Sequence, residues 1–204
     1  MVRTRDHAVL KTNFINIIGA IDMMKGLDYH HANFMNTVNQ LIETGWPRKI
    51  KLQASLLHEA TAYLNRLGQF YYFVLSTFVQ KRCPNAELLI PTIKSFVPFR
   101  MKYSAHRSID APKNESEMVQ AAQAMSMSSI GGQLFQPKPG HVADISRIKT
   151  EADYDDYVKS NWKHCYYVFQ LITDDRNVYH NFSIEKEHPA IIDEAFAVLK
   201  EILK

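Results

Sequence analysis

The sequence predicts a mostly α protein: an antiparallel helical bundle with a C-terminal β-hairpin and a final helix. Between residues 14 and 81, apolar side chains recur at steps of three and four, the period of an amphipathic helix. After Trp162 the chain becomes rich in β-branched and aromatic residues, which is typical of strands. Of the 204 residues 46% are hydrophobic, enough for one sizeable core, so residues 1–204 are expected to form a single domain.

The first helix is predicted over residues 14–42. Its apolar positions follow a period near 3.6 and define one buried stripe: Phe14, Ile17, Ile18, Ile21, Met24, Leu27, Phe34, Val38 and Leu41. Gly45 follows the stripe, and Pro47 sits where a first helical turn tolerates proline. The chain is therefore expected to turn back there and form a helical hairpin.

The second helix is predicted over residues 47–81. Its expected inward face consists of Leu52, Leu56, Leu57, Ala60, Leu64, Leu67, Phe70, Val74, Leu75 and Phe78. Around residues 70–75 the apolar character extends over most of the helix circumference, which indicates burial by more than one neighbour or by a second subunit. Burial within one chain is the favoured interpretation.

A third helix is predicted to begin near Ala86 or Pro91 and to carry residues 100–110. Pro98 lies inside it and lacks a backbone donor, so a kink is expected just before Arg100. Pro112 disfavours helical geometry in the residue before it and ends the helix. Residues 14–110 are therefore expected to form the helical core.

The rest of the chain divides into two parts. Residues 111–161 are predicted to be an irregular connector with turns near residues 137–140, apart from short helices at residues 115–127 and after the Thr150–Asp153 capping box. Residues 162–204 are predicted to contain a β-hairpin, with strands at residues 166–172 and 178–184. A last helix is expected to start at residues 188–189 and to bury Ile191, Ile192, Phe196, Leu199 and Ile202.

Charge and cysteine content limit the class of protein. The chain has 24 Lys and Arg residues and 21 Asp and Glu residues, which gives a net charge of +3. This charge is too small for a protein that wraps nucleic acid or binds a membrane surface, so any basic patch must be local. The two cysteines, Cys83 and Cys165, permit one disulfide but lack zinc-site spacing. With neither a signal-peptide pattern nor a long apolar span in view, we expect a soluble cytoplasmic protein without membrane contact.

The most site-like segment lies at the end of the third helix. It collects cations, hydroxyl groups and one imidazole: Arg100, Lys102, Tyr103, Ser104, His106 and Arg107. Arg100 and Arg107 are seven residues apart and share a helix face, where guanidinium groups suit phosphate oxygens. Lys102 lies four residues before His106, and a cation so close is expected to lower the pKa of the imidazole and favour the neutral, basic form.

Other patterns of histidine are less informative. His58 is followed by Glu59, but Ala62 stands where a metalloprotease helix needs its second histidine. His30 and His31 are adjacent and diverge by about 100° on a helix, so a shared metal ion is not expected without ligands from elsewhere.

Two long antiparallel helices followed by a helix with Arg100, five residues and His106 resemble the HEPN superfamily (higher eukaryotes and prokaryotes nucleotide-binding). The resemblance implies a helical bundle, often a homodimer, with this motif at the subunit interface of metal-independent ribonucleases. It implies Arg100 and His106 as the catalytic pair, no cofactor, and RNA or a nucleotide as partner. Lys102, Tyr103, Ser104 and Arg107 would then bind nucleic acid.

The implied chemistry is general base catalysis. Neutral His106 would take the proton of an RNA 2′ hydroxyl as that oxygen attacks the phosphorus, while Arg100 stabilises charge on the phosphoryl oxygens. On one straight helix these two side chains point about 120° apart, so the kink or a twofold partner must bring them together.

Two alternatives remain open. The same face can belong to a non-catalytic module that binds a nucleotide or a protein, or the basic side chains can serve only to complement the helix end. The chain can also be a structural dimer that meets its partner through Tyr71, Tyr72 and Phe73.

Overall fold

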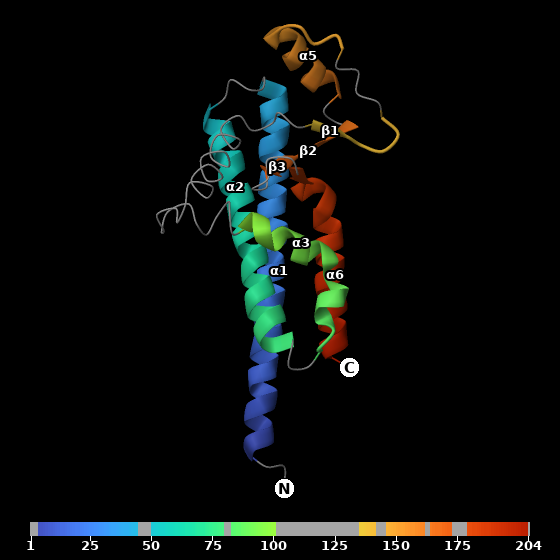
Figure 1. Cartoon of the computed structure of the whole chain (residues 1–204). Coiled ribbons are helices and arrows are strands. Elements are labelled where there is room, and N and C mark those ends of the chain that lie inside the picture. Colours follow the sequence, from blue (N-terminus) through green and yellow to red (C-terminus); the bar gives the residue numbers. More distant parts are fainter. Residues whose placement is uncertain are drawn as a thin grey trace, which may run out of the picture.

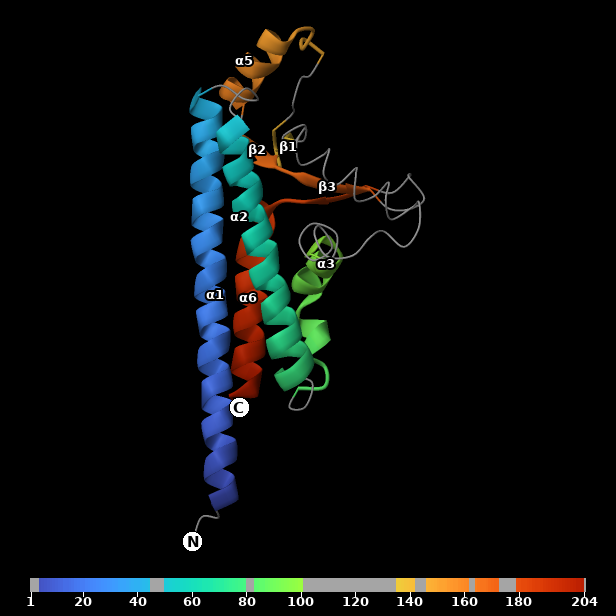
Figure 2. The ribbon, with the colours of Figure 1, turned by 90° about the vertical axis from the view of Figure 1, so that its left-hand side faces the viewer.

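A computed structural model describes residues 4–44, 50–79, 83–100, 135–141, 146–161, 164–172 and 179–203. These residues are mostly helical with a minor β component, which confirms the predicted fold class. Figures 1 and 2 show a bundle of long helices, with the small strands and a short helix gathered toward one end.

The predicted helical hairpin is confirmed. Helix α1 spans Thr4–Thr44, a run of 41 residues, which at 1.5 Å per residue is about 60 Å long. Helix α2 spans Ile50–Gln69 and returns antiparallel beside α1 (Figure 1). The chain then continues as a π-helix, η1 (Phe70–Val79), instead of the single α-helix that the sequence predicts over residues 47–81. A π-helix has wider hydrogen-bonded turns, so the facing side chains are rotated from their α-helical positions.

The seam between α1 and α2 forms the centre of the core. From α1 it buries Ala20, Met24, Leu27, Phe34, Val38, Leu41 and Ile42. From α2 and η1 it buries Leu56, Ala60, Tyr63, Leu64, Leu67, Phe70, Val74, Leu75 and Val79. Most of the predicted inward positions of both helices are therefore confirmed.

The predicted burial of the first part of the α1 stripe is wrong. Phe14, Ile18 and Ile21 were expected in the core but are exposed, and Phe14 keeps 63% of its surface accessible. Figures 1 and 2 show that the N-terminal end of α1 extends past the ends of the other helices. Ala20 is buried on the other face of this part of α1, so the described neighbours cover one face and leave these three side chains exposed. Apolar periodicity predicts which face of a helix is hydrophobic, but the helices packed against it determine how much of that face is buried.

Burial around η1 is also less complete than predicted. Phe70, Val74 and Leu75 are buried, whereas Tyr72 and Phe73 are exposed. After η1, Cys83 is buried with a free thiol, and a short 3-10 helix, η2 (Ala86–Leu89), leads into helix α3 (Pro91–Arg100). The predicted third helix thus begins at Pro91, at the first helical position, where proline is tolerated.

In the part of the chain that the structure describes, four short strands form two separate antiparallel pairs. Strand β3 (Phe169–Ile172) pairs with β4 (Tyr179–Phe182), which confirms the hairpin. Strand β2 (Cys165–Tyr167) instead pairs with β1 (Phe135–Pro137). The connector of residues 111–161, predicted to be irregular, therefore supplies a strand, and this strand pairs with β2 and not with the β3–β4 hairpin.

Helix α5 (Glu151–Asn161) begins at the predicted capping box. The Asp153 backbone N–H donates to Thr150 Oγ1 at 3.1 Å, and the Thr150 N–H donates to Asp153 Oδ2 at 2.9 Å. The Thr150 side chain and the backbone N–H groups of Lys149 and Thr150 lower the pKa of Asp153, because their hydrogen bonds to its carboxylate favour the ionised form. The predicted turn after β1 is confirmed by Gly140, whose φ of 83° suits glycine.

The last helix, α6 (Ile184–Ile202), begins earlier than predicted. Ser183 is extended and its hydroxyl accepts a hydrogen bond from the Lys186 N–H, so this N-cap starts the helix before Pro189. Ile191 and Leu199 are buried as predicted, but Phe196 is exposed. Helix α6 packs against α1 and α3.

Among the residues that the structure describes, no helix combines the length and apolar character required to cross a bilayer.

Replacement of two phenylalanines on α1, one buried and one exposed, tests whether burial determines their contribution to stability. Phe34→Ala, at a position with 0% exposure, is expected to lower the free energy of unfolding by about 3–5 kcal/mol, because it removes buried surface and leaves a cavity. Phe14→Ala is the matched control and is expected to cost less than about 1 kcal/mol. Urea unfolding measures both, and equal losses would contradict the described packing.

Candidate functional site

The predicted basic segment begins at the end of helix α3. Arg100 is the last residue of α3. Lys102, Tyr103, Ser104, His106 and Arg107 lie outside the described residues. Whether these side chains converge on one phosphate therefore stays a prediction, as does the kink expected at Pro98.

What the structure does describe is how α3 is held. The carboxylate of Glu194 on α6 accepts from the Thr92 N–H and from the Ile93 N–H, both at 2.9 Å. A carboxylate at this position satisfies two free backbone donors and complements the positive end of the helix dipole. Ile93 and Phe96 are buried below it, and the Phe96 ring meets the Phe182 ring edge to face at 5.0 Å. The start of α3 is thus anchored to α6 and the core.

One cation of α3, Lys94, forms an ion pair with a carboxylate of η2. Lys94 Nζ lies 2.7 Å from Glu87 Oε2 on η2, and the Tyr71 hydroxyl donates to the other oxygen of the same carboxylate at 3.4 Å. The hydrogen bond from Lys94 lowers the pKa of Glu87, while the carboxylate raises the pKa of Lys94. This exposed pair keeps both charges at the surface of the bundle.

A second group of polar side chains lies where α1, α2 and α6 meet. We name it the His31–His188 cluster, and its members are Asp28, His31, Tyr63 and His188. The two imidazole rings stack with centroids 3.9 Å apart and planes 7° apart. His188 Nδ1 lies 3.0 Å from the Tyr63 hydroxyl, and His188 Nε2 lies 3.1 Å from Asp28 Oδ1.

Burial decides the protonation of this cluster. The pKa of His31 is lowered to about 4, first by burial and then by the neighbouring His188, while Asp28 acts in the opposite direction. Burial also lowers the pKa of His188, although Asp28 again acts in the opposite direction. The pKa of Tyr63 is raised, first by burial and then by Asp28. At neutral pH both imidazoles are therefore uncharged and the phenol keeps its proton.

The hydrogen-bond pattern follows from these charges. Tyr63 donates its hydroxyl proton to Nδ1 of His188, and the Nε2–H of His188 donates to the Asp28 carboxylate. The Nε2 atom of His31 is buried without a hydrogen-bond partner. Tyr63 has 0% exposure, so a substrate has no access to its hydroxyl. The cluster is therefore suited to holding helices together and to responding to protons, and not to covalent catalysis.

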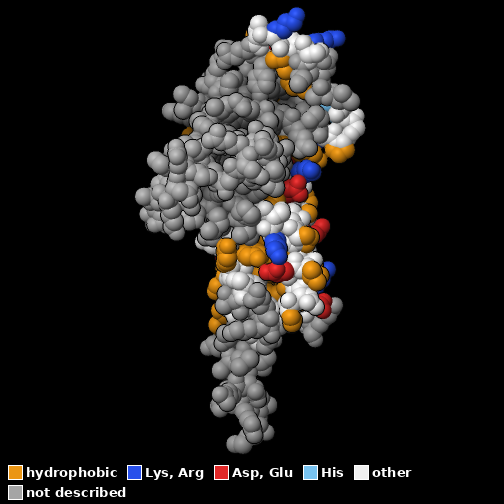
Figure 3. Space-filling view, viewed as in Figure 1, with side chains coloured by type: hydrophobic (Ala, Val, Ile, Leu, Met, Phe, Trp, Pro, Cys, Tyr) orange, Lys and Arg blue, Asp and Glu red, His pale blue; other side chains and the backbone are white. Residues whose placement is uncertain are grey.

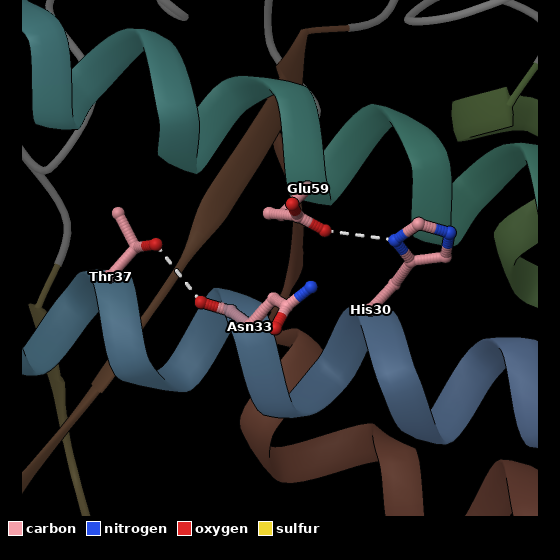
Figure 4. Close-up of polar contacts among 4 residues, drawn as sticks. All are labelled: His30, Asn33, Thr37 and Glu59. Atoms are coloured by element: carbon pink, nitrogen blue, oxygen red, sulfur yellow. Dashed lines mark hydrogen bonds and ion pairs between the residues drawn. The ribbon is translucent and has the colours of Figure 1, made fainter.

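His30, the neighbour of His31, faces a different helix. Its Nδ1 atom lies 2.8 Å from Glu59 Oε2 on α2, in a half-buried pair that Figure 4 shows bridging the two helices. Figure 4 also shows Thr37, whose hydroxyl donates to the Asn33 carbonyl one turn earlier at 2.9 Å. The two adjacent histidines thus point to different partners, as their helical spacing predicts. In the described part of the chain, no group of three or more His, Cys, Asp or Glu residues is placed to hold a metal ion.

A polar hollow of about 480 Å³ lies beside helix α5. Arg147, Asp156 and Ser160 line it together with Asp153, whose carboxylate is engaged in the helix cap. The hollow carries charges of both signs, and nothing in its lining selects a particular ligand.

Sequence reasoning missed the His31–His188 cluster. His31 and His188 are 157 positions apart, and each alone resembles an ordinary polar residue within a helix. Polar residues are common on both amphipathic helices, so no local signal singles out Asp28, His31 and Tyr63, and only tertiary contact shows that they meet.

Comparison with protein-family models, curated proteins and solved structures finds no match to this chain.

Replacement of the Tyr63 hydroxyl tests the described hydrogen-bond pattern. Tyr63→Phe keeps the buried ring but leaves His188 Nδ1 without its donor, and it is expected to lower the free energy of unfolding by about 1–3 kcal/mol. Tyr29→Phe, on the exposed face of α1, is the matched control and is expected to change it by less than about 0.5 kcal/mol. Indistinguishable urea midpoints for the two variants would rule out the bond.

Proposed function

We propose that this protein is a cytoplasmic, metal-independent endoribonuclease or RNA-processing factor of HEPN type. Arg100 and His106 act as the catalytic pair, and Lys102, Tyr103, Ser104 and Arg107 bind the RNA backbone. The cysteine content supports a reducing compartment, since Cys83 is buried as a free thiol.

One observation carries the proposal. An antiparallel pair of long helices, α1 and α2, supports a third helix whose described residues reach Arg100, and the HEPN resemblance implies this order of elements. The Glu194 carboxylate anchors the other end of that third helix. An anchored helix gives the Arg100 backbone a defined position, which favours precise placement of a catalytic group.

The proposed chemistry needs a cation, a neutral imidazole and a 2′ hydroxyl. Arg100 supplies fixed donors for the phosphoryl oxygens, and His106 accepts the hydroxyl proton. DNA lacks this hydroxyl, so the activity is expected to be specific for RNA.

We further propose that the protein acts as a homodimer. Four exposed residues on α1, Phe14, Ile15, Ile18 and Ile21, form an apolar stripe that its own chain leaves uncovered among the described residues. Figure 3 shows that hydrophobic side chains are also exposed on the lower half of the face that it draws. Contiguous apolar surface of this kind is typical of protein contacts.

The stripe continues onto the neighbouring helix. A Cβ atom built on Gly19 would lie 4.0 Å from Phe73 Cε1, so the ring of Phe73 lies against α1 one turn from Ile15. Tyr72 and Phe73 are both exposed. A twofold partner presents the same apolar residues in return, so a second copy of this chain is the occupant that this surface fits.

The dimer surface is also compatible with one alternative function, a non-catalytic module that binds a nucleotide or a protein through its basic segment. This alternative shares the dimer and the salt-sensitive binding of RNA but has no turnover.

An RNA cleavage assay in EDTA tests the proposed activity. His106→Ala is expected to lower the rate by at least about a hundredfold, because a general base contributes that much or more. His58→Ala, at an exposed position of α2, is the control and is expected to keep the wild-type rate. Equal cleavage by His106→Ala and wild type excludes the catalytic assignment, and RNA binding without cleavage by wild type supports the non-catalytic alternative.

Light scattering tests the dimer. Ile18→Glu and Tyr72→Glu are each expected to halve the measured mass, because a buried unpaired carboxylate opposes association. Leu88→Glu places the same charge at an exposed apolar position on η2, outside the stripe, and is expected to leave the mass unchanged. A wild-type mass equal to one chain, or two stripe variants that remain dimeric, would contradict this surface.

A further inference from the structure

We propose that the His31–His188 cluster is a proton-sensitive latch, which holds helix α6 on α1 and α2 at neutral pH and releases it when the medium is acidified. This inference does not depend on the proposed ribonuclease activity.

The geometry favours neutral rings. His31 and His188 are stacked almost parallel at 3.9 Å, so two positive charges there would face each other across one van der Waals contact. The buried Nε2 atom of His31 has no hydrogen-bond partner. A proton added to that atom would create a buried N–H without an acceptor, which is costly.

Protonation of His188 also disturbs Tyr63. In the neutral state the Tyr63 hydroxyl donates to Nδ1 of His188. A proton on Nδ1 converts that acceptor into a donor, so the hydroxyl must turn its own proton elsewhere. Tyr63 is fully buried, and the bonds of the cluster provide no second acceptor for it.

The surrounding charges do not remove this penalty. Asp28 on α1 attracts a proton to either ring, but its side chain is 61% exposed and its attraction is screened by water. Tyr63 on α2 keeps its proton, and the neighbouring carboxylate of Glu59 is paired with His30. On α6 itself, Glu185 and Glu187 are paired with Lys138 and Lys186.

The direction of the pH effect follows from the lowered pKa of both histidines. The unfolded chain binds protons near the ordinary pKa of histidine, about 6.5, whereas the folded cluster binds them only at lower pH. Stability is therefore complete above that pH and falls as the pH drops from about 6.5 toward the folded value of about 4 for His31.

Release of α6 has a consequence for α3. Glu194 lies six residues after His188 on the same helix, less than two turns away, and holds the N-terminus of α3. A loosened α6 therefore loosens the anchor of α3, while the apolar seam of α1 and α2 stays packed.

Urea unfolding of the full chain at about pH 7.5 and about pH 5 tests the latch. The unfolding constant of the wild type is expected to rise on the order of tenfold over this interval. His31→Phe keeps a ring for stacking, and His188→Gln keeps a donor and an acceptor, but neither titrates. Each is expected to lose roughly half or more of the response, whereas the exposed control His58→Gln keeps it. Full responses in both cluster variants would overturn the proposal.

Two measurements on the folded wild type remain decisive if a variant does not fold. NMR titration of the ring protons is expected to give midpoints for His31 and His188 below the ordinary value of about 6.5, and midpoints at or above it contradict the latch. Hydrogen exchange at about pH 5, corrected for intrinsic rates, is expected to accelerate along α6 and at the start of α3. Uniform acceleration that includes the α1–α2 seam would indicate general unfolding and overturn the latch.

Discussion

The apolar seam between α1 and α2 is the interaction on which the rest of this fold depends. Leu27, Phe34 and Leu41 of α1 are fully buried, and Leu64 and Leu67 of α2 are nearly so. A helix as long as α1 gains most of its stability from packing of this kind and not from intrinsic propensity. Helices α3 and α6 dock onto the pair, so the polar contacts between these helices depend on the seam.

Polar contacts then determine how α6 is placed. Apolar surfaces attract without strong direction, whereas a buried polar group must meet a partner of matching geometry. His188 bonds to one residue of α1 and one of α2, and Glu194 bonds to two backbone N–H groups of α3. These two residues determine the rotation of α6 about its own axis and its position along the bundle. Of the two, His188 is the group whose pKa burial lowers, and the proposed response to pH depends on it.

The position of the neighbouring helices explains the exposed apolar surface. The stripe on α1 follows the same apolar period as the buried seam, yet it lies on a face of the helix that no described neighbour covers. Ile18 and Leu27 are therefore equally suited to a core, and only the second has a neighbour to cover it. A surface left over in this way is where a second chain gains the most from association.

The sequence by itself determined the fold class, the helical hairpin, the capped start of α5 and the β3–β4 hairpin, because periodicity, capping residues and turn residues are local signals. It also identified the Arg100 segment as the candidate site. Only the tertiary structure decided that Phe14 and Phe196 are exposed, that β1 pairs with β2, and that His31 meets His188. Exposure, strand partners and contacts between distant helices depend on which elements lie side by side, and no local pattern in the chain encodes that.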